Sequence, residues 1–379
     1  MGIFANPLTD LLEYEDFSRD FLKGTDPVGM TGCIDSEKVH FMSTFLGEKK
    51  VQLVVTYNEQ RAREIEEDYK LFCSQVYVIP PRDLIFFSAD LQGNAIIAER
   101  MKAFAALYQN EAKVIITTMD ALMSAAVPFE QLMSHVIKLK EGDELDLEKL
   151  KHDLTVMGYE RVGRVEEPGQ FTVHGGIADV YPLTMEVPVR IELWGDEIDS
   201  IRSFDPESQR SLENLEELTI YPAVEHIGDK DMVSFLDYFP EERTIIFLDE
   251  PNRLTEKGGA VEEEYRQSRM HREEKGSRNL PENWLCSFEQ LQKELNKRNC
   301  ISVCALEPKQ AGWKVREKFY LEVKSISAYN NSFELLVKDL LQYKSQGYRI
   351  ALLSGSRTRA ERLAKDLSEE GLNAFYRQD

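Results

Sequence analysis

A short loop near the amino terminus has the spacing of a phosphate-binding site. Residues 29–36 read Gly-Met-Thr-Gly-Cys-Ile-Asp-Ser and precede a segment with helical spacing. Phosphate binding requires glycines, N–H groups at a helix start, and a Lys-Ser/Thr pair for the phosphates and magnesium. Asp35 stands where the lysine is needed, and its carboxylate repels phosphate at short range. We therefore expect a vestigial loop that binds no nucleotide. Its members are Gly29, Thr31, Gly32, Asp35 and Ser36.

A pair of acidic residues, Asp249 and Glu250, follows the apolar run 244–248. In nucleotide hydrolases, such a pair at a strand end holds magnesium and orients water. Two acidic residues at a strand end are also common in any acidic protein. Because the loop lacks its lysine, the pair predicts a vestigial Walker B element without catalytic residues.

Composition narrows the functional class further. The chain has 67 acidic and 46 basic side chains, and a net charge of −21 disfavours bulk binding to nucleic acid. Its histidines and five cysteines show no ligand spacing, so we expect no metal centre, disulfide framework or cofactor. No secretion signal or membrane-spanning run is present in the sequence, which favours a cytoplasmic protein.

Alternating strand and helix patterns predict the domain organisation. β-Branched runs at 50–57, 113–118 and 243–249, separated by segments with helical spacing, predict an α/β fold with a largely parallel sheet. Short strands replace this rhythm after Pro128. The expected segments are 1–126 and 224–322 as halves of one α/β domain, 127–223 as an inserted α+β domain, and 323–379 as a small, incomplete α/β domain.

The small domain should contain two helices and two strands. Residues 332–346 and 357–370 have helical spacing, and glycines follow both segments as expected for helix ends. Residues 348–354 and 372–376 have strand composition.

A stretch in the inserted segment carries a family resemblance. Residues 169–182 alternate apolar and polar positions around a glycine pair, and 189–202 continue the alternation, which predicts antiparallel strands. Together with Phe204-Asp-Pro-Glu-Ser-Gln-Arg-Ser, they resemble the domain shared by UvrB and the transcription-repair coupling factor (Mfd) family. The Gly-x-Thr-Gly opening of the loop also resembles UvrB. The resemblance implies a degenerate P-loop, helicase-like domain of the UvrB type.

In UvrB the corresponding surface docks UvrA, so the resemblance implies UvrA as the partner. The expected docking residues are Arg161, Phe171, His174, Arg190 and Glu192, and all of them except His174 match the family motifs. Arginines suit this role because their planar fork pairs with carboxylates at an interface. Thr172 and His174 stand where UvrB-type sequences carry arginine, which predicts weaker or pH-sensitive docking. Alternatively, Arg190 and Glu192 form only a cross-strand surface pattern.

The resemblance points to a non-catalytic adaptor that recruits UvrA to stalled RNA polymerase in nucleotide excision repair. In the family, further domains contact RNA polymerase and form an ATP-driven DNA translocase, and we expect intramolecular contacts with them. Residues 80–90 are short and lack tyrosine where UvrB has a DNA-clamping hairpin, so weak or no DNA binding is expected. The alternatives are a nucleotide- or damaged-DNA-binding subunit of a repair helicase, and an autoinhibitory module of the translocase.

Overall fold

The structure is a computed structural model of the 379-residue chain. The described residues are 6–9, 12–23, 27–47, 50–82, 94–225, 232–274, 284–307, 312–321, 326, 328–330 and 332–377. The segment 83–90, which includes most of the region expected to lack a DNA-clamping hairpin, lies outside them. Contacts divide the chain into a large unit, 7–321, and a small unit formed by 322–379 with the first six residues.

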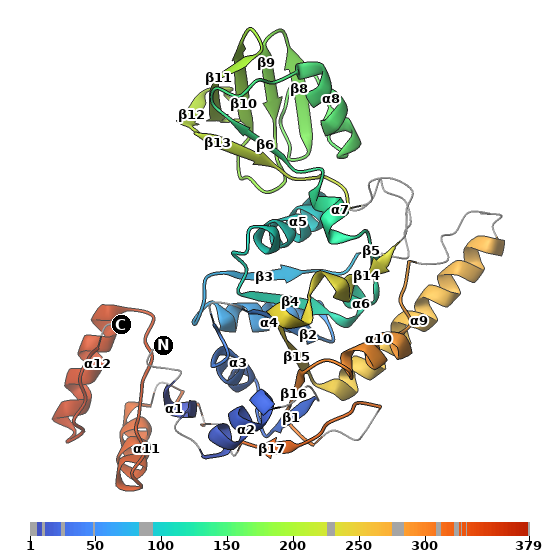
Figure 1. The fold of residues 1–379 in the computed structure, drawn as a ribbon. Coiled ribbons are helices and arrows are strands. Elements are labelled where there is room, and N and C mark those ends of the chain that lie inside the picture. Colours follow the sequence, from blue (N-terminus) through green and yellow to red (C-terminus); the bar gives the residue numbers. More distant parts are fainter. Residues whose placement is uncertain are drawn as a thin grey trace. The chain divides into compact units, whose positions relative to one another are not determined.

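A seven-stranded parallel sheet forms the centre of the large unit (Figure 1), in the order β17-β1-β16-β15-β2-β4-β3. Its strands are β1 (Val28–Thr31), β2 (Val51–Thr56), β3 (Val76–Ile79), β4 (Val114–Thr118), β15 (Thr244–Asp249), β16 (Cys300–Cys304) and β17 (Lys318–Tyr320). Strands β4, β15 and β16 are buried along their whole length, as their apolar runs require. The predicted α/β fold with a parallel sheet is confirmed.

Strands from before and after the insertion alternate in this sheet. β15 lies between β2 and β16, and β1 lies between β16 and β17. The two flanking segments of sequence therefore build one sheet.

Helices follow five strands of the sheet: α3 (Ser36–Ser43), α4 (Glu59–Tyr69), α5 (Asn94–Tyr108), α6 (Met119–Met123) and α9 (Pro251–Glu274). Two helices, α1 (Asn6–Thr9) and α2 (Leu12–Lys23), precede β1, and α10 (Phe288–Leu295) precedes β16. Local capping explains several of the starts: the Asn58 side chain accepts from Arg61 N at 2.8 Å, and Ser287 caps α10. Smaller elements are β5 (Ala125–Ala126) paired with β14 (Val233–Ser234), η2 (Phe235–Tyr238) and η3 (Glu241–Arg243). No described helix is both long and apolar enough to cross a membrane.

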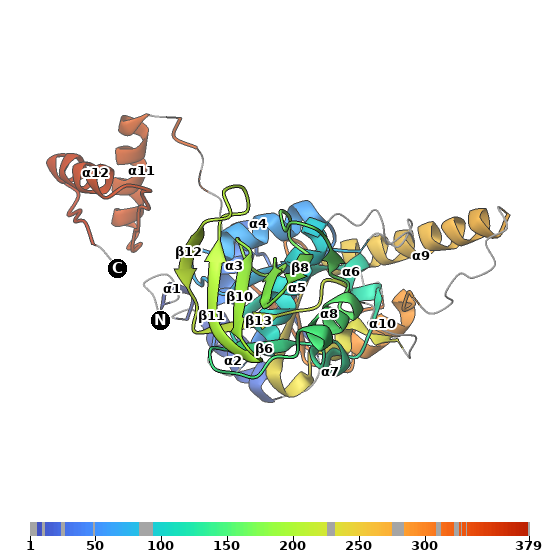
Figure 2. The same ribbon diagram turned by 90° about the horizontal axis from the view of Figure 1, so that it is seen from above.

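The inserted segment contains a second sheet, of six strands in the order β12-β11-β10-β9-β8-β7. These are β7 (Glu160–Arg161), β8 (Gln170–His174), β9 (Ile177–Val180), β10 (Val189–Trp194), β11 (Glu197–Phe204) and β12 (Ser211–Asn214). Figure 2 labels β12, β11, β10 and β8 of this sheet. α7 (Phe129–Met133), α8 (Leu147–Val156) and the pair β6 (Ile137–Lys140) and β13 (Glu217–Ile220) complete the segment. Alternate residues of the strands, with Leu150 and Leu154 of α8, form one apolar core.

A buried ion pair ties the end of the insertion to α5. Arg100 Nη2 donates to Glu225 Oε2 at 3.0 Å, and Arg82 Nη1 lies 3.7 Å from the same oxygen. The Arg100 and Glu225 side chains are 1% and 8% exposed. The Arg100 guanidinium also lies over the rings of Phe104 and Phe235. The chain therefore returns from the insertion to the α/β domain at a polar contact inside an apolar environment.

The small unit has the two predicted helices, α11 (Phe333–Ser345) and α12 (Arg357–Glu369), which share a core of four buried residues. The strands predicted at 348–354 and 372–376 are wrong, because neither segment pairs with another among the described residues. Leu353 and Phe375 are 71% and 80% exposed. Strand composition alone cannot form a strand without a neighbour to accept its backbone hydrogen bonds.

Candidate functional site

The six-stranded sheet of the inserted segment has one apolar and one polar face. Phe171, Val173 and Ile191 point into the core, and side chains alternate between faces along a strand. His174, Arg190 and Glu192 therefore lie on the opposite, outer face. The sequence prediction grouped five residues into one docking site, and this sheet presents three of them together.

Arg190 is held on the outer face by its neighbour on β9. Its Nε and Nη2 atoms donate to the two carboxylate oxygens of Asp179 at 2.7 and 2.8 Å. The guanidinium lies 4.7 Å from the centre of the Phe204 ring. Hydrogen bonding to Asp179 raises the pKa of Arg190 above its ordinary value, against the effect of desolvation. A bidentate pair of this kind fixes the arginine within its own sheet.

Glu192 also has a partner within the sheet. Its carboxylate pairs with Arg202 of β11, and Ser200 donates to the same oxygen. Both charges that were expected to meet a partner thus have intramolecular counter-ions. The alternative interpretation, a cross-strand charge pattern, describes these two contacts, while docking by the same residues stays a prediction.

The remaining three predicted docking residues differ in accessibility. His174 is exposed and its Nε2 lies 2.9 Å from Thr172 Oγ1. Arg161 is exposed on the edge strand β7, where it pairs in register with Phe171. Phe171 is fully buried, so a direct contact between its ring and a partner is excluded in this structure. Phe171 was selected because it matched a family motif, and its burial shows that it supports the core.

Two exposed apolar side chains on this face were missed by the sequence interpretation. Trp194 is 84% exposed at the end of β10, and Ile177 is 40% exposed at the start of β9. Ile177 pairs in register with Glu192, and Leu193 N donates to Gly176 O at 2.8 Å. Ile177 and Trp194 therefore lie at the same end of the sheet. The available signal was a tryptophan at a position where alternation calls for a polar residue.

The nucleotide-like loop follows β1, and the backbone of Leu321 lies against Thr31 and Gly32. Leu321 N donates to Thr31 O at 2.8 Å, and Thr31 Oγ1 donates to Phe319 O at 3.0 Å. Gly32 has φ +88°, and a Cβ at this position would lie 2.1 Å from Leu321 O. Gly32 is therefore needed for the close approach of Leu321.

Acidic groups surround the start of α3. Asp35 has φ 45° and its side chain makes no capping hydrogen bond. Ile34 N donates to Glu37 Oε2 at 3.4 Å. The Ser36 hydroxyl hydrogen-bonds Asp68, where a phosphate loop would direct it to magnesium. Burial raises the pKa of the Asp68 carboxyl, and this hydrogen bond partly opposes the rise.

Asp249 and Glu250 at the end of β15 have a basic partner that the sequence interpretation overlooked. Lys38 Nζ donates to Asp249 Oδ1 at 2.7 Å and to Glu250 Oε1 at 2.6 Å. Asp35 still stands at the motif position of the lysine, and the ammonium that meets the acidic pair comes instead from α3, two residues after Ser36. A motif comparison at fixed spacing could not find it.

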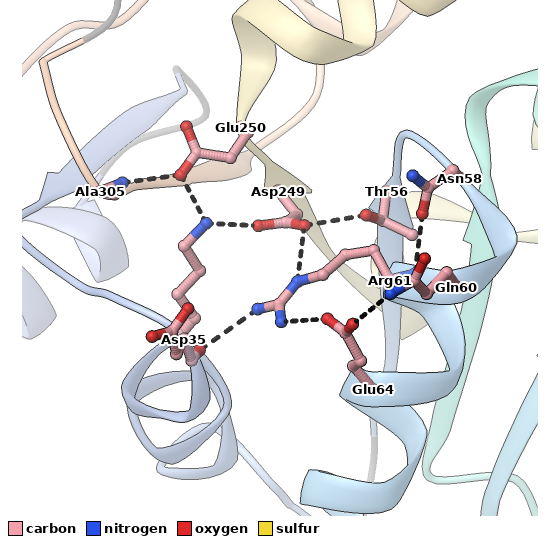
Figure 3. Close-up of polar contacts among 10 residues, drawn as sticks. Asp35, Thr56, Asn58, Gln60, Arg61, Glu64, Asp249, Glu250 and Ala305 are labelled. Atoms are coloured by element: carbon pink, nitrogen blue, oxygen red, sulfur yellow. Dashed lines mark hydrogen bonds and ion pairs between the residues drawn. The ribbon is translucent and has the colours of Figure 1, made fainter. Parts of the chain in front are cut away.

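Further donors complete this polar cluster (Figure 3). Thr56 Oγ1 donates to Asp249 Oδ2 at 2.8 Å, and Arg61 Nε lies 3.5 Å from the same oxygen. Ala305 N donates to Glu250 Oε1 at 2.8 Å. Desolvation lowers the pKa of Lys38, but Asp249 and Glu250 outweigh it and leave the pKa raised. The cluster therefore favours a charged ammonium between two carboxylates.

Comparison with known proteins identifies relatives of this fold. A family model for the UvrB interaction domain matches residues 137–226. A transcription-repair-coupling factor of Staphylococcus haemolyticus (strain JCSC1435) is 34% identical over 220 residues, covering 57% of this chain and 19% of the relative. One from Staphylococcus aureus (strain USA300) is 33% identical over 243 residues, covering 62% of this chain and 20% of the relative. The chain is similar to the N-terminal region of transcription-repair-coupling factors.

This chain spans about a fifth of the length of these transcription-repair-coupling factors. The matched UvrB interaction domain contains the whole six-stranded sheet, including Arg161, His174 and Trp194. The nucleotide-like loop and the Lys38 cluster lie outside the matched residues. The two candidate sites therefore belong to different parts of the chain and can be tested separately.

Proposed function

We propose that the inserted domain docks UvrA and that this chain acts as a non-catalytic adaptor in transcription-coupled repair. The match to the UvrB interaction domain supports this proposal. So does the resemblance of residues 169–210 to the surface through which UvrB docks UvrA. The similarity to transcription-repair-coupling factors supports a role in transcription-coupled repair.

The observation that carries the proposal is the exposed indole of Trp194 beside Ile177 on the outer face of the six-stranded sheet. A tryptophan that is 84% exposed leaves a large apolar surface in water. Tryptophan is also enriched among the residues that dominate binding energy at protein interfaces. Trp194 is thus the anchor of the proposed contact, and His174, which pairs in register with Ile177, lies on the same outer face.

The ion pairs of the outer face have a supporting role in this proposal. Because Arg190 is paired with Asp179 and Glu192 with Arg202, these four charges stay in fixed positions before docking. A preformed surface loses less side-chain entropy on binding. Arg161 at the sheet edge is the exposed arginine of the predicted set and remains available for a carboxylate of the partner.

The non-catalytic part of the proposal rests on the α/β domain. Asp35 replaces the phosphate-binding lysine, and Leu321 closely approaches the loop at Gly32. A domain of this kind serves as a scaffold for the inserted domain. Contacts with RNA polymerase and DNA translocation are proposed for the remainder of a full-length relative, which this chain would connect to UvrA.

A pull-down with purified UvrA tests the proposal. Trp194→Ala should weaken UvrA binding by about 30-fold or more, since anchor residues contribute at least about 2 kcal/mol. Arg161→Ala should weaken it less. Leu71→Ala, which removes a side chain that is 71% exposed outside the inserted domain, is the matched control and should bind normally.

Three results would overturn the proposal. The first is a wild-type chain that does not bind UvrA, and the second is a Trp194→Ala variant that binds UvrA as well as wild type does. The third is micromolar affinity of the isolated chain for ATP, which would favour the nucleotide-binding alternative.

A further inference from the structure

The Lys38 ammonium lies between Asp249 and Glu250 as a bound metal cation would lie between two carboxylates. The Lys38 nitrogen lies 2.7 Å and 2.6 Å from one oxygen of each carboxylate. The Lys38 and Asp249 side chains are 5% and 1% exposed, and that of Glu250 is 23% exposed. The positive charge therefore bridges the two carboxylates largely out of contact with water.

The oxygen atoms around Lys38 are the ligands that a hard divalent cation prefers. Two carboxylates and the nearby Thr56 hydroxyl stand at the carboxyl ends of β15 and β2. Bound Mg²⁺ or Mn²⁺ would have to lie between the carboxylates. The Lys38 ammonium fills that place. The described residues contain no group of three or more acidic, histidine or cysteine side chains that could hold a metal, either here or elsewhere.

Charge balance explains why the cluster is stable without a metal. Asp249 faces both Lys38 and Arg61, and Arg61 also pairs with Glu64 at 3.0 Å. Two buried carboxylates without a counter-charge would be strongly unfavourable. Lys38 and Arg61 lie on α3 and α4, whereas the acidic pair lies beyond the insertion, so the cluster also joins the two segments of the sheet.

We propose that Lys38 is a built-in counter-ion that occupies a divalent-cation site formed by Asp249, Glu250 and Thr56. Because the cation is covalently part of the chain, the site neither needs nor accepts a free metal ion. Removal of the ammonium exposes the site to Mg²⁺ or Mn²⁺. This inference goes beyond the adaptor function and does not depend on UvrA.

Manganese binding to the full 379-residue chain tests the proposal, with Lys38→Ala as the main variant. Electron paramagnetic resonance measures free Mn²⁺, and thermal unfolding is followed in EDTA and in millimolar Mn²⁺. Wild type should show neither binding nor a shift in its melting temperature. Lys38→Ala should bind one Mn²⁺ with an affinity at least about tenfold above the detection limit set for wild type, and it should melt at a higher temperature in Mn²⁺ than in EDTA.

Two further variants locate the effect. Lys38→Ala combined with Asp249→Asn should lose the Mn²⁺ binding, because one carboxylate is gone. Lys257→Ala is the matched control, since Lys257 forms an ion pair with Asp120 at 2.9 Å outside this cluster, and it should behave as wild type towards Mn²⁺.

The possible outcomes separate clearly. If Lys38→Ala folds only when Mn²⁺ is present, the proposal is supported. A folded Lys38→Ala that binds Mn²⁺ no better than wild type overturns it, as does a wild-type chain that binds Mn²⁺ through Asp249. If Lys38→Ala folds under neither condition, Lys38→Gln decides the matter: Mn²⁺ binding by the folded variant supports the proposal, and its absence overturns it.

Discussion

Lys38 and Asp249 are 211 positions apart in the sequence, and their side chains meet at 2.7 Å. The contact joins α3, in the first segment of the α/β domain, to the end of β15, in the second. An ammonium with two carboxylate acceptors in a buried position resists deprotonation. This relationship makes the stability of the domain sensitive to the charge of one lysine.

Alkaline pH should remove the contribution of Lys38 to stability. The pKa of Lys38 is raised above 10.5, because Asp249 and Glu250 outweigh the opposing effect of burial. A raised pKa means that the stabilisation is fully present below about pH 10.5 and is lost as the pH rises through the folded-state value. Urea unfolding should therefore show that the free energy of unfolding of wild type exceeds that of Lys38→Met by a constant amount from neutral pH to about pH 10. Above about pH 10 this difference in free energy should decrease. A difference that persists unchanged at the highest accessible pH would contradict this assignment.

Gly32→Ala should destabilise the domain. The new Cβ would meet Leu321 O at 2.1 Å, and the residue would have to hold φ at +88°. Positive φ in a residue other than glycine costs about 1–3 kcal/mol, and displacement of the Leu321 backbone adds to it. Gly47→Ala is the control, since Gly47 has no positive φ and a Cβ there would meet its nearest atom, Phe45 O, at 4.0 Å. It should therefore be nearly neutral in urea unfolding. Equal stability of the two variants would show that the Leu321 segment is free to move off the loop.

The two ion pairs of the outer face should differ in strength. Arg190–Asp179 is bidentate, with side chains 23% and 10% exposed, whereas Arg202–Glu192 has side chains 31% and 30% exposed. Double-mutant cycles of urea unfolding should give a coupling energy of about 1.5–3 kcal/mol for the first pair. The more exposed pair should give less than about 1 kcal/mol. The reverse order would mean that solvent screening does not control these contacts.

Glu225→Ala should strongly destabilise the junction between the inserted domain and α5. It would leave the buried Arg100 and Arg82 guanidinium groups without the carboxylate, and breaking a buried pair costs about 3–5 kcal/mol. A matched surface pair is available, because Lys102, also on α5, pairs with Glu186, whose side chain is 88% exposed. Glu186→Ala should change the free energy of unfolding by no more than about 1 kcal/mol. Thermal denaturation compares the two, and similar melting temperatures would refute the importance of the buried pair.

Much of the fold followed from local pattern. The apolar runs near 51–56, 114–118 and 244–249 were recognisable as buried strands, because burial on both faces requires uninterrupted apolar residues. The strands predicted near 350 and 374 were not formed, since strand formation depends on a neighbour that local composition cannot supply.

The candidate sites were harder to predict because they depend on contacts between distant positions. Asp179 and Arg202 neutralise Arg190 and Glu192 only through the register of three strands. Lys38 reaches Asp249 only after the sheet has brought β1 and β15 to within one strand of each other. Trp194 was present in the sequence, but its exposure depends on where β10 ends.

The order of strands in the large sheet has a consequence for biosynthesis. β1 pairs with β16 and β17, so during translation residues 32–299 are made before the first strand that can pair with β1. At about 5–20 residues per second, this interval is at least roughly ten seconds. The six-stranded sheet of the insertion uses only nearby sequence and can fold within that time. An emerging chain therefore exposes an unpaired apolar strand until residue 300 has been made, although the inserted domain is complete well before.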